Sequence, residues 1–200
     1  MTSAHDANGY QELAAEFIAR RSPDIGVATV LDWRARLPVR AAVLDLGCGS
    51  GIPLSRALAD AGCDLFGIDA SPSMIAAFQS NVRGARAACE PAETSGFFGR
   101  RFEGVLAWGL IFLVPPDAQR TIIGRVRGAL AGGASFLFTA PAQPCTWTDI
   151  LTGRESVSLG RAEYTAALEG AGMQLVAEHD DAGGNHYYEA RYVDHRPELE

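Results

Sequence analysis

Apolar residues follow two different spacings along the chain. Short continuous apolar runs predict buried strands, and stretches with apolar residues every three or four positions predict amphipathic helices. The two kinds alternate through the middle of the sequence, which predicts a parallel, doubly wound α/β sheet that binds ligands at the carboxyl ends of its strands. The expected strands are 41–46, 64–68, 85–89, 102–108 and 134–139, and the expected helices are 52–61, 71–81 and 116–130.

Helical spacing also marks the region before the first strand. Two amphipathic helices are expected there, the second opening at Ser22-Pro23, a pair typical of an N-cap followed by the first helical residue. We therefore expect an N-terminal helical cap at 1–38, followed by the sheet domain at 39–198, in a single compact unit.

The last third of the chain begins with a long connection that lacks clear periodicity, 141–159. Loops of this length are uncommon in compact domains unless they form a lid or a binding segment. A helix at 160–170 follows, and 173–178 with 186–193 are expected to close the sheet as an antiparallel hairpin.

Composition restricts the class of protein. Contents of 48% hydrophobic and 20% charged residues are those of an ordinary soluble globular domain. The net charge of −7, without a basic stripe, argues against a nucleic-acid substrate. No apolar run approaches the ~20 residues of a membrane span. The four cysteines lack C-x-x-C spacing, which favours reduced thiols in a cytoplasmic protein over a zinc site, and no metal is expected.

Three glycines at alternate positions, Gly47, Gly49 and Gly51, follow the first expected strand. Asp69 stands 18 positions after Gly51, at the end of the second strand. Glycine lets the backbone approach a ligand closely, and a carboxylate at that place can accept hydrogen bonds from two ribose hydroxyls. The pattern predicts a nucleoside-binding βαβ unit.

The glycine spacing also discriminates between nucleosides. Dinucleotide sites use G-x-G-x-x-G, whereas Ile52 stands where the third of those glycines would be. No Lys or Arg lies between Arg40 and Arg56, and Asp45 precedes the first glycine, so a pyrophosphate is disfavoured. A nicotinamide-dependent oxidoreductase is kept as an alternative.

The segment Val43–Gly51 followed by Asp69 resembles motif I of class I S-adenosylmethionine (SAM)-dependent methyltransferases, and the resemblance extends over most of the chain. Ala129–Gly133 is similar to the turn before the family's fifth strand, with Ala131 in place of the usual proline. The resemblance implies a seven-stranded, mostly parallel sheet of order 3-2-1-4-5-7-6. It also implies methyl transfer from SAM to an O, N or S atom of a small molecule, with S-adenosylhomocysteine as product. A SAM-binding module without catalysis is a further alternative.

The resemblance implies a set of cofactor-binding residues. The glycine turn would pass under the amino-acid part of SAM, Asp69 would hold the ribose, and Glu90, or its rival Glu93, would accept from the adenine amino group. A core tyrosine and a surface arginine are equally good interpretations of Tyr10 and Arg21. The expected set is Tyr10, Arg21, Asp45, Gly47, Cys48, Gly49, Ser50, Gly51, Asp69, Ala70, Ser71, Met74, Glu90, Pro91, Ala107 and Trp108.

The methyl acceptor is expected beside the ends of the fourth and fifth strands. Asp149 and His186 are the candidates for proton transfer, although a lone histidine entering a strand is more often structural. We expect a small-molecule partner, no nucleic acid or membrane, and a monomer or homodimer. The expected acceptor-site residues are Trp108, Phe112, Trp147 and Tyr187.

Overall fold

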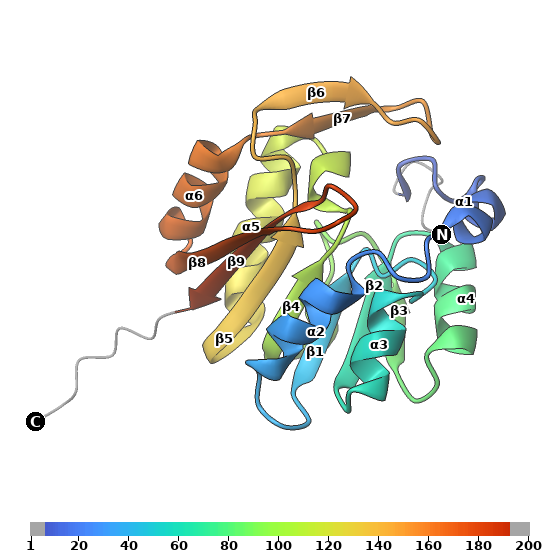
Figure 1. Cartoon of the computed structure of the whole chain (residues 1–200), viewed down its shortest axis with the longest axis horizontal. Helices are drawn as coiled ribbons and strands as arrows, with labels where there is room; N and C mark the ends of the chain where they lie inside the picture. Colours follow the sequence, from blue (N-terminus) through green and yellow to red (C-terminus); the bar gives the residue numbers. More distant parts are fainter. Residues whose placement is uncertain (1–6, 193–200) are drawn as a thin grey trace, which may run out of the picture.

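The computed structural model describes residues 7–192, which form a seven-stranded sheet covered by helices on both faces (Figure 1). The first five strands along the chain are parallel, and β9 pairs antiparallel with both β5 and β8. The expected strand order is confirmed, with β9 and β8 in the last two places. In spatial order the strands are β3 (Arg86–Cys89), β2 (Asp64–Asp69), β1 (Ala42–Leu46), β4 (Phe102–Ala107), β5 (Leu130–Thr139), β9 (His186–Tyr192) and β8 (Met173–Asp180).

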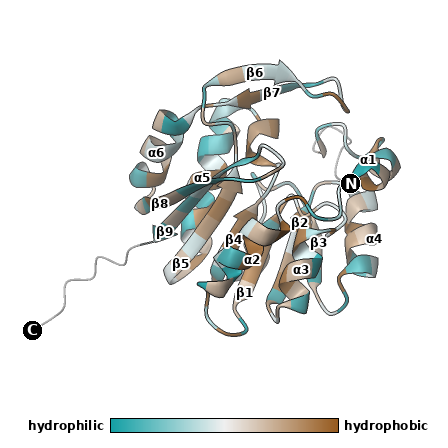
Figure 2. Ribbon diagram, viewed as in Figure 1, coloured by the Kyte–Doolittle hydropathy of each residue, from teal (hydrophilic) through white to brown (hydrophobic). Residues whose placement is uncertain are grey.

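The inner strands are apolar on both faces because helices cover both (Figure 2). Residues such as Val43 and Leu106 pack against α2 (Val27–Ala35) and α3 (Leu54–Asp60). Their alternate neighbours, among them Leu44 and Val105, pack on the other face in the cluster that contains the buried residues of α5 (Pro116–Ala129) and α6 (Arg161–Gly170). Packing on both faces therefore fixes the positions of the residues at the strand ends.

One of the two expected helix starts is confirmed. The Ser71 hydroxyl accepts a hydrogen bond from the Met74 amide at 3.2 Å and caps α4 (Pro72–Asn81). The expectation for Ser22 is wrong, because α2 begins only at Val27. Gly26 has φ +83°, and a Cβ there would lie 2.8 Å from the Tyr187 hydroxyl, so the chain turns at this glycine before the helix begins.

The expected loop at 141–159 contains a small hairpin of its own, β6 (Cys145–Thr148) paired with β7 (Glu155–Ser158). Its strands have four residues each and are mostly polar, so no apolar run marked them. The buried Gln119 side chain donates to the Val157 carbonyl at 2.8 Å and accepts from the Tyr164 hydroxyl at 2.7 Å. These bonds hold the hairpin over the strand ends (Figure 1).

The N-terminal segment, which we define as residues 7–21 and which contains α1 (Ala14–Arg20), lies at the same edge of the sheet. Gln11 accepts from the Ser71 hydroxyl at 2.7 Å, and the Tyr10 hydroxyl donates to Asp149 at 3.2 Å, at the tip of the β6–β7 hairpin. The expected N-terminal cap also included α2, but α2 packs on a face of the sheet and does not lie over the strand ends. The outer ends of the two expected domains, 1–6 and 193–198, lie outside the described residues. No helix within 7–192 has the length and apolar content for a membrane span.

Candidate functional site

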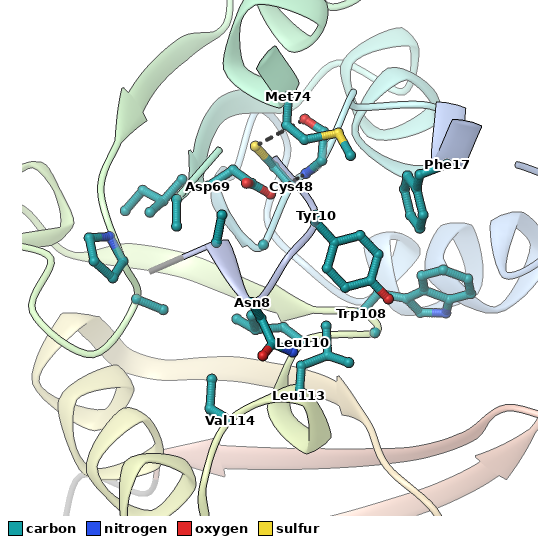
Figure 3. A pocket seen from close by; sticks show the side chains of 18 of the residues that line it. Asn8, Tyr10, Phe17, Cys48, Asp69, Met74, Trp108, Leu110, Leu113 and Val114 are labelled. Carbon is teal, nitrogen blue, oxygen red and sulfur yellow. Dashed lines mark hydrogen bonds between the residues drawn. The ribbon is translucent and has the colours of Figure 1, made fainter. Parts of the chain in front are cut away.

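A cavity of about 290 Å³ lies at the carboxyl ends of the parallel strands. It is enclosed by the N-terminal segment, the glycine turn after β1, the ends of β2, β3 and β4, the 3₁₀ turn Ile111–Leu113, and Asp149 of the hairpin tip (Figure 3). Open α/β sheets place their ligands at this position.

The glycine turn has three left-handed residues, Gly47, Gly49 and Gly51, with φ of +67°, +53° and +78°. Its first two amides, those of Gly47 and Cys48, donate to the Ile68 carbonyl at 2.8 and 3.0 Å, which ties the turn to β2. A Cβ on Gly49 would touch only the Phe17 ring, at 3.8 Å, so this glycine lies beneath the α1 side of the cavity. A Cβ on Gly51 would lie 2.5 Å from a Val82 methyl, so Gly51 serves helix packing and does not line the cavity.

Asp69 is fixed at the cavity wall by two backbone amides. Its Oδ2 accepts from the Gly49 amide at 2.9 Å and its Oδ1 from the Ser71 amide at 2.8 Å. Burial raises the pKa of Asp69, and these two bonds oppose that effect. Each carboxylate oxygen can accept a second hydrogen bond, which suits a pair of neighbouring hydroxyl groups.

Asp45 lies behind the turn and does not line the cavity. The side chain is 4% exposed and accepts a hydrogen bond from the Ser55 hydroxyl at 2.6 Å. Burial raises the pKa of Asp45 to about 7, against the opposing effects of Ser55 and of the Arg21 charge. Asp45 was expected to contact a ligand directly, but in this structure it does not reach the cavity.

Arg21 brings a cation to the cavity. Its guanidinium lies 4.0 Å from the Trp108 ring centre and 5.0 Å from that of Phe17. Burial lowers its pKa to about 10, and the charge of Asp45 opposes that change. No residue in 7–192 forms an ion pair or side-chain hydrogen bond with it, so it remains available to an anionic group of a ligand.

The β3 side of the cavity carries both candidate acids, Glu90 and Glu93. The Glu90 amide donates to the Asp69 carbonyl at 3.0 Å, and its side chain accepts from the Ser95 hydroxyl at 2.7 Å. Because both acids line the cavity, the choice between them stays open. Met74 lies on the α4 side of the same space (Figure 3).

Trp108 and Phe112 line the opposite end, each with an aromatic residue behind it. The Trp108 indole donates to the Tyr187 hydroxyl at 2.7 Å, and Tyr187 is fully buried. The Trp147 ring lies 5.2 Å from that of Phe112. Tyr187 and Trp147 therefore support the wall but are not part of the lining.

The two proton-transfer candidates are separated. Asp149 lines the cavity. His186 does not, and its ring nitrogens lie 2.8 Å from Asp180 and 3.2 Å from Glu178, while its ring packs on Tyr188. Alternate residues of a strand face opposite sides, so His186 points away from the face that carries Tyr187. Its expected catalytic role is not supported by this placement.

Most of the expected residues come together around one space. Those that line it are Tyr10, Arg21, Gly47, Cys48, Gly49, Ser50, Asp69, Ala70, Met74, Glu90, Pro91, Trp108, Phe112 and Asp149. Those that do not are Asp45, Gly51, Ser71, Ala107, Trp147, Tyr187 and His186.

Several lining residues had not been expected. The apolar run after β4 supplies Leu110, Leu113 and Val114, and its position at a strand end was a usable signal. Phe17 lies on α1, where a helical apolar pattern alone does not distinguish a ligand wall from a core. The others are Ala7, Asn8, Ile52, Ile68, Ala92, Gly109 and Asn185.

This fold and site define a Rossmann-like protein with a nucleoside-type cavity. Residues 43–133 match the family model described as a methyltransferase domain, and the strand order is the one expected for the class I methyltransferase fold. No curated protein sequence gives a significant match.

Solved methyltransferase structures share this fold over nearly the whole chain. The CcbJ methyltransferase from Streptomyces caelestis is 18% identical with a TM-score of 0.73, covering 94% of this chain and 98% of its own. Magnesium protoporphyrin IX methyltransferase from Synechocystis PCC 6803, with bound SAM, is 16% identical with a TM-score of 0.72, covering 94% and 95%. CalS10, an amino pentose methyltransferase from Micromonospora echinaspora, also with SAM, is 18% identical with a TM-score of 0.70, covering 91% and 96%.

Proposed function

We propose that this protein transfers the methyl group of SAM to an O, N or S atom of a small molecule. The family match and the cavity support this proposal. The observation that carries it is the fixed carboxylate of Asp69 beside the glycine turn, with the unpaired Arg21 lining the same cavity.

The residues present fit SAM group by group. Asp69 would accept from the ribose hydroxyls, the glycine turn would lie against the amino-acid part, and Arg21 would pair with its carboxylate. Met74 and Glu90 would hold the adenine. SAM, when bound, supplies a methyl group made electrophilic by the sulfonium. The protein contributes alignment and exclusion of water, and alignment alone is worth roughly 7–11 kcal/mol in the best intramolecular reactions.

The size and position of the cavity support a small acceptor. Its volume is about 290 Å³, and the N-terminal segment and the β6–β7 hairpin are joined beside it by the Tyr10–Asp149 hydrogen bond. The structural relatives include methyltransferases of an amino pentose and of magnesium protoporphyrin IX. Nucleic acid is an unsuitable partner for a chain of net charge −7.

The setting of the protein belongs to the same proposal. Four free cysteines support a cytoplasmic location. We propose a monomer or homodimer in which residues 1–38 form the N-terminal helical region and 39–198 the methyltransferase domain.

Isothermal titration with S-adenosylhomocysteine tests the proposal. We expect sub-millimolar binding, weakened at least about 100-fold by Asp69→Ala, since two hydrogen bonds to a charged group are lost at roughly 1.5–3 kcal/mol each. Asp32→Ala, which removes an exposed carboxylate on α2, is the matched control.

Two results would contradict the assignment. One is the absence of S-adenosylhomocysteine binding, and the other is NADH binding with higher affinity in a parallel fluorescence titration. Tight cofactor binding without turnover across an acceptor panel would instead indicate a non-catalytic module.

A further inference from the structure

The hydrogen-bond donors around the Trp108 end of the cavity are already used within the protein. The Trp108 indole donates to Tyr187, and the Tyr187 hydroxyl donates in turn to Asp181 at 2.8 Å. The Tyr10 hydroxyl donates to Asp149 at 3.2 Å. Burial and the neighbouring Asp149 charge raise the pKa of Tyr10, so this hydroxyl keeps its proton at neutral pH.

Hydrogen-bond acceptors at this end are not used up. Asp149 Oδ1 accepts from the amides of Leu151 and Thr152 and from the Thr152 hydroxyl, whereas Oδ2 accepts only from Tyr10. Asn185 directs its amide nitrogen at Asp181, and its Oδ1 has no donor among residues 7–192. Both side chains line the cavity, so this end offers acceptors without donors.

Two other side chains that line the cavity, those of Asn8 and Arg21, could donate hydrogen bonds to a ligand. Asn8 has a buried, unpaired Nδ2, but it also lines a neighbouring hollow with Pro91, Glu93 and Thr94, on the β3 side. Arg21 lies over Trp108, and its charge is matched by the SAM carboxylate in the proposed function. With Arg21 so occupied, Asp149 is the charged group left to meet an acceptor.

We propose that the methyl acceptor is an amine on an apolar, preferably aromatic, small molecule, with its N–H group held by Asp149 Oδ2 and Asn185 Oδ1. Trp108, Leu110 and Phe112 supply the apolar wall for the rest of the molecule. This inference rests on the proposed function, because it takes Arg21 as the partner of the cofactor.

The chemistry agrees with this assignment. As the neutral amine takes the methyl group, a C–N bond forms, the C–S bond breaks, and positive charge moves from sulfur to nitrogen. A carboxylate next to that nitrogen stabilises the developing charge. An alkylamine is mostly protonated in neutral water, so one proton passes to solvent before the transfer, and the methylated ammonium product carries the positive charge away. No histidine of residues 7–192 lines the cavity to take that proton.

The test uses three probes built on one ring, benzylamine, benzyl alcohol and benzoate, titrated into the protein saturated with S-adenosylhomocysteine. We expect benzylamine to bind most tightly. Asp149→Asn should lower its affinity about tenfold and leave that of benzyl alcohol within about twofold. Glu155→Gln, which removes an exposed carboxylate from the same hairpin, should change none of the three.

Preference for benzoate would overturn the inference and would place the acceptor's anion on Arg21. Equal binding of the three probes, or a parallel loss of benzylamine and benzyl alcohol in Asp149→Asn, would overturn it as well. Binding of S-adenosylhomocysteine is measured first in each variant, so a failure of the proposed function is seen separately from a failure of the amine assignment.

Discussion

Two buried carboxylates, Asp45 and Asp69, end adjacent strands but have different roles because their surroundings differ. Asp69 accepts hydrogen bonds from two backbone amides and faces the cavity. Asp45 accepts a hydrogen bond from the Ser55 hydroxyl and lies behind the glycine turn. The sequence indicated the place of both at strand ends, since strand periodicity and glycine spacing are local. Which of them faces the ligand depends on the turn between them, and no local pattern encodes that.

Asp45 should make stability depend on pH. Its pKa is near 3.8 when unfolded and about 7 when folded, so the folded state binds the proton more tightly. The contribution of Asp45 to the unfolding free energy is therefore fully present at low pH and is lost as pH rises through 4–7, by an amount on the order of a few kcal/mol. The charged and titratable groups that act on Asp45 are Arg21, whose charge opposes the shift, and Asp69, whose charge adds to it.

Urea unfolding at pH 5, 6, 7 and 8 measures this effect. We expect Asp45→Asn to flatten the decline, because the amide keeps an acceptor for Ser55 and cannot ionise. Asp32→Asn on the exposed side of α2 should retain the wild-type slope. An unchanged slope in Asp45→Asn would show that other groups cause the pH dependence.

At the scale of elements, the regular part of the fold followed from the sequence and the enclosure of the site did not. Buried strands and the capped α4 have strong local signals, apolar runs and Ser71-Pro72. The β6–β7 hairpin has short, mostly polar strands, and the buried Gln119, 38 positions before Val157, donates to the Val157 carbonyl and anchors it. Tyr10 also had no local signal for its role, because its hydrogen-bond partner Asp149 is 139 positions away in the sequence.

The Tyr10–Asp149 hydrogen bond is the side-chain hydrogen bond that joins the N-terminal segment to the hairpin tip within residues 7–192. Tyr10→Phe removes it while Gln11 still anchors the segment to α4. A partly exposed bond to a charged group is worth about 1 kcal/mol, so S-adenosylhomocysteine should dissociate roughly fivefold faster. Stopped-flow displacement measures the rate.

Tyr188→Phe is the matched control for that prediction. The Tyr188 hydroxyl is buried without a hydrogen-bond partner and lies outside the cavity lining, so its removal should leave the dissociation rate unchanged. Equal rates in the wild type and both variants would mean that the segment and hairpin do not retain the ligand.

At the scale of the whole molecule, the cavity wall is assembled from both ends of the chain. Residues 7–21 and 145–158 enclose a space whose floor belongs to residues 43–133, the part that matches the methyltransferase family. Sequence similarity therefore covers the cofactor floor and the apolar wall at Trp108, Leu110 and Phe112, while Asp149 and Asn185, the polar groups proposed to hold the acceptor, lie outside the match. This explains why the cofactor was easier to infer than the acceptor.

Hydrogen exchange with and without S-adenosylhomocysteine tests whether these parts act as one unit. Because ligand contacts link the floor to the enclosing segments, we expect slower exchange in 7–21, 47–52 and 145–158 together. Residues 161–180, in α6 and β8, do not line the cavity and should not change. Asp69→Ala at the same ligand concentration should lose the protection in all three segments. Protection confined to 47–52 would instead mean that the cofactor binds the glycine turn while the cavity stays open, and that the enclosing segments respond only to the methyl acceptor.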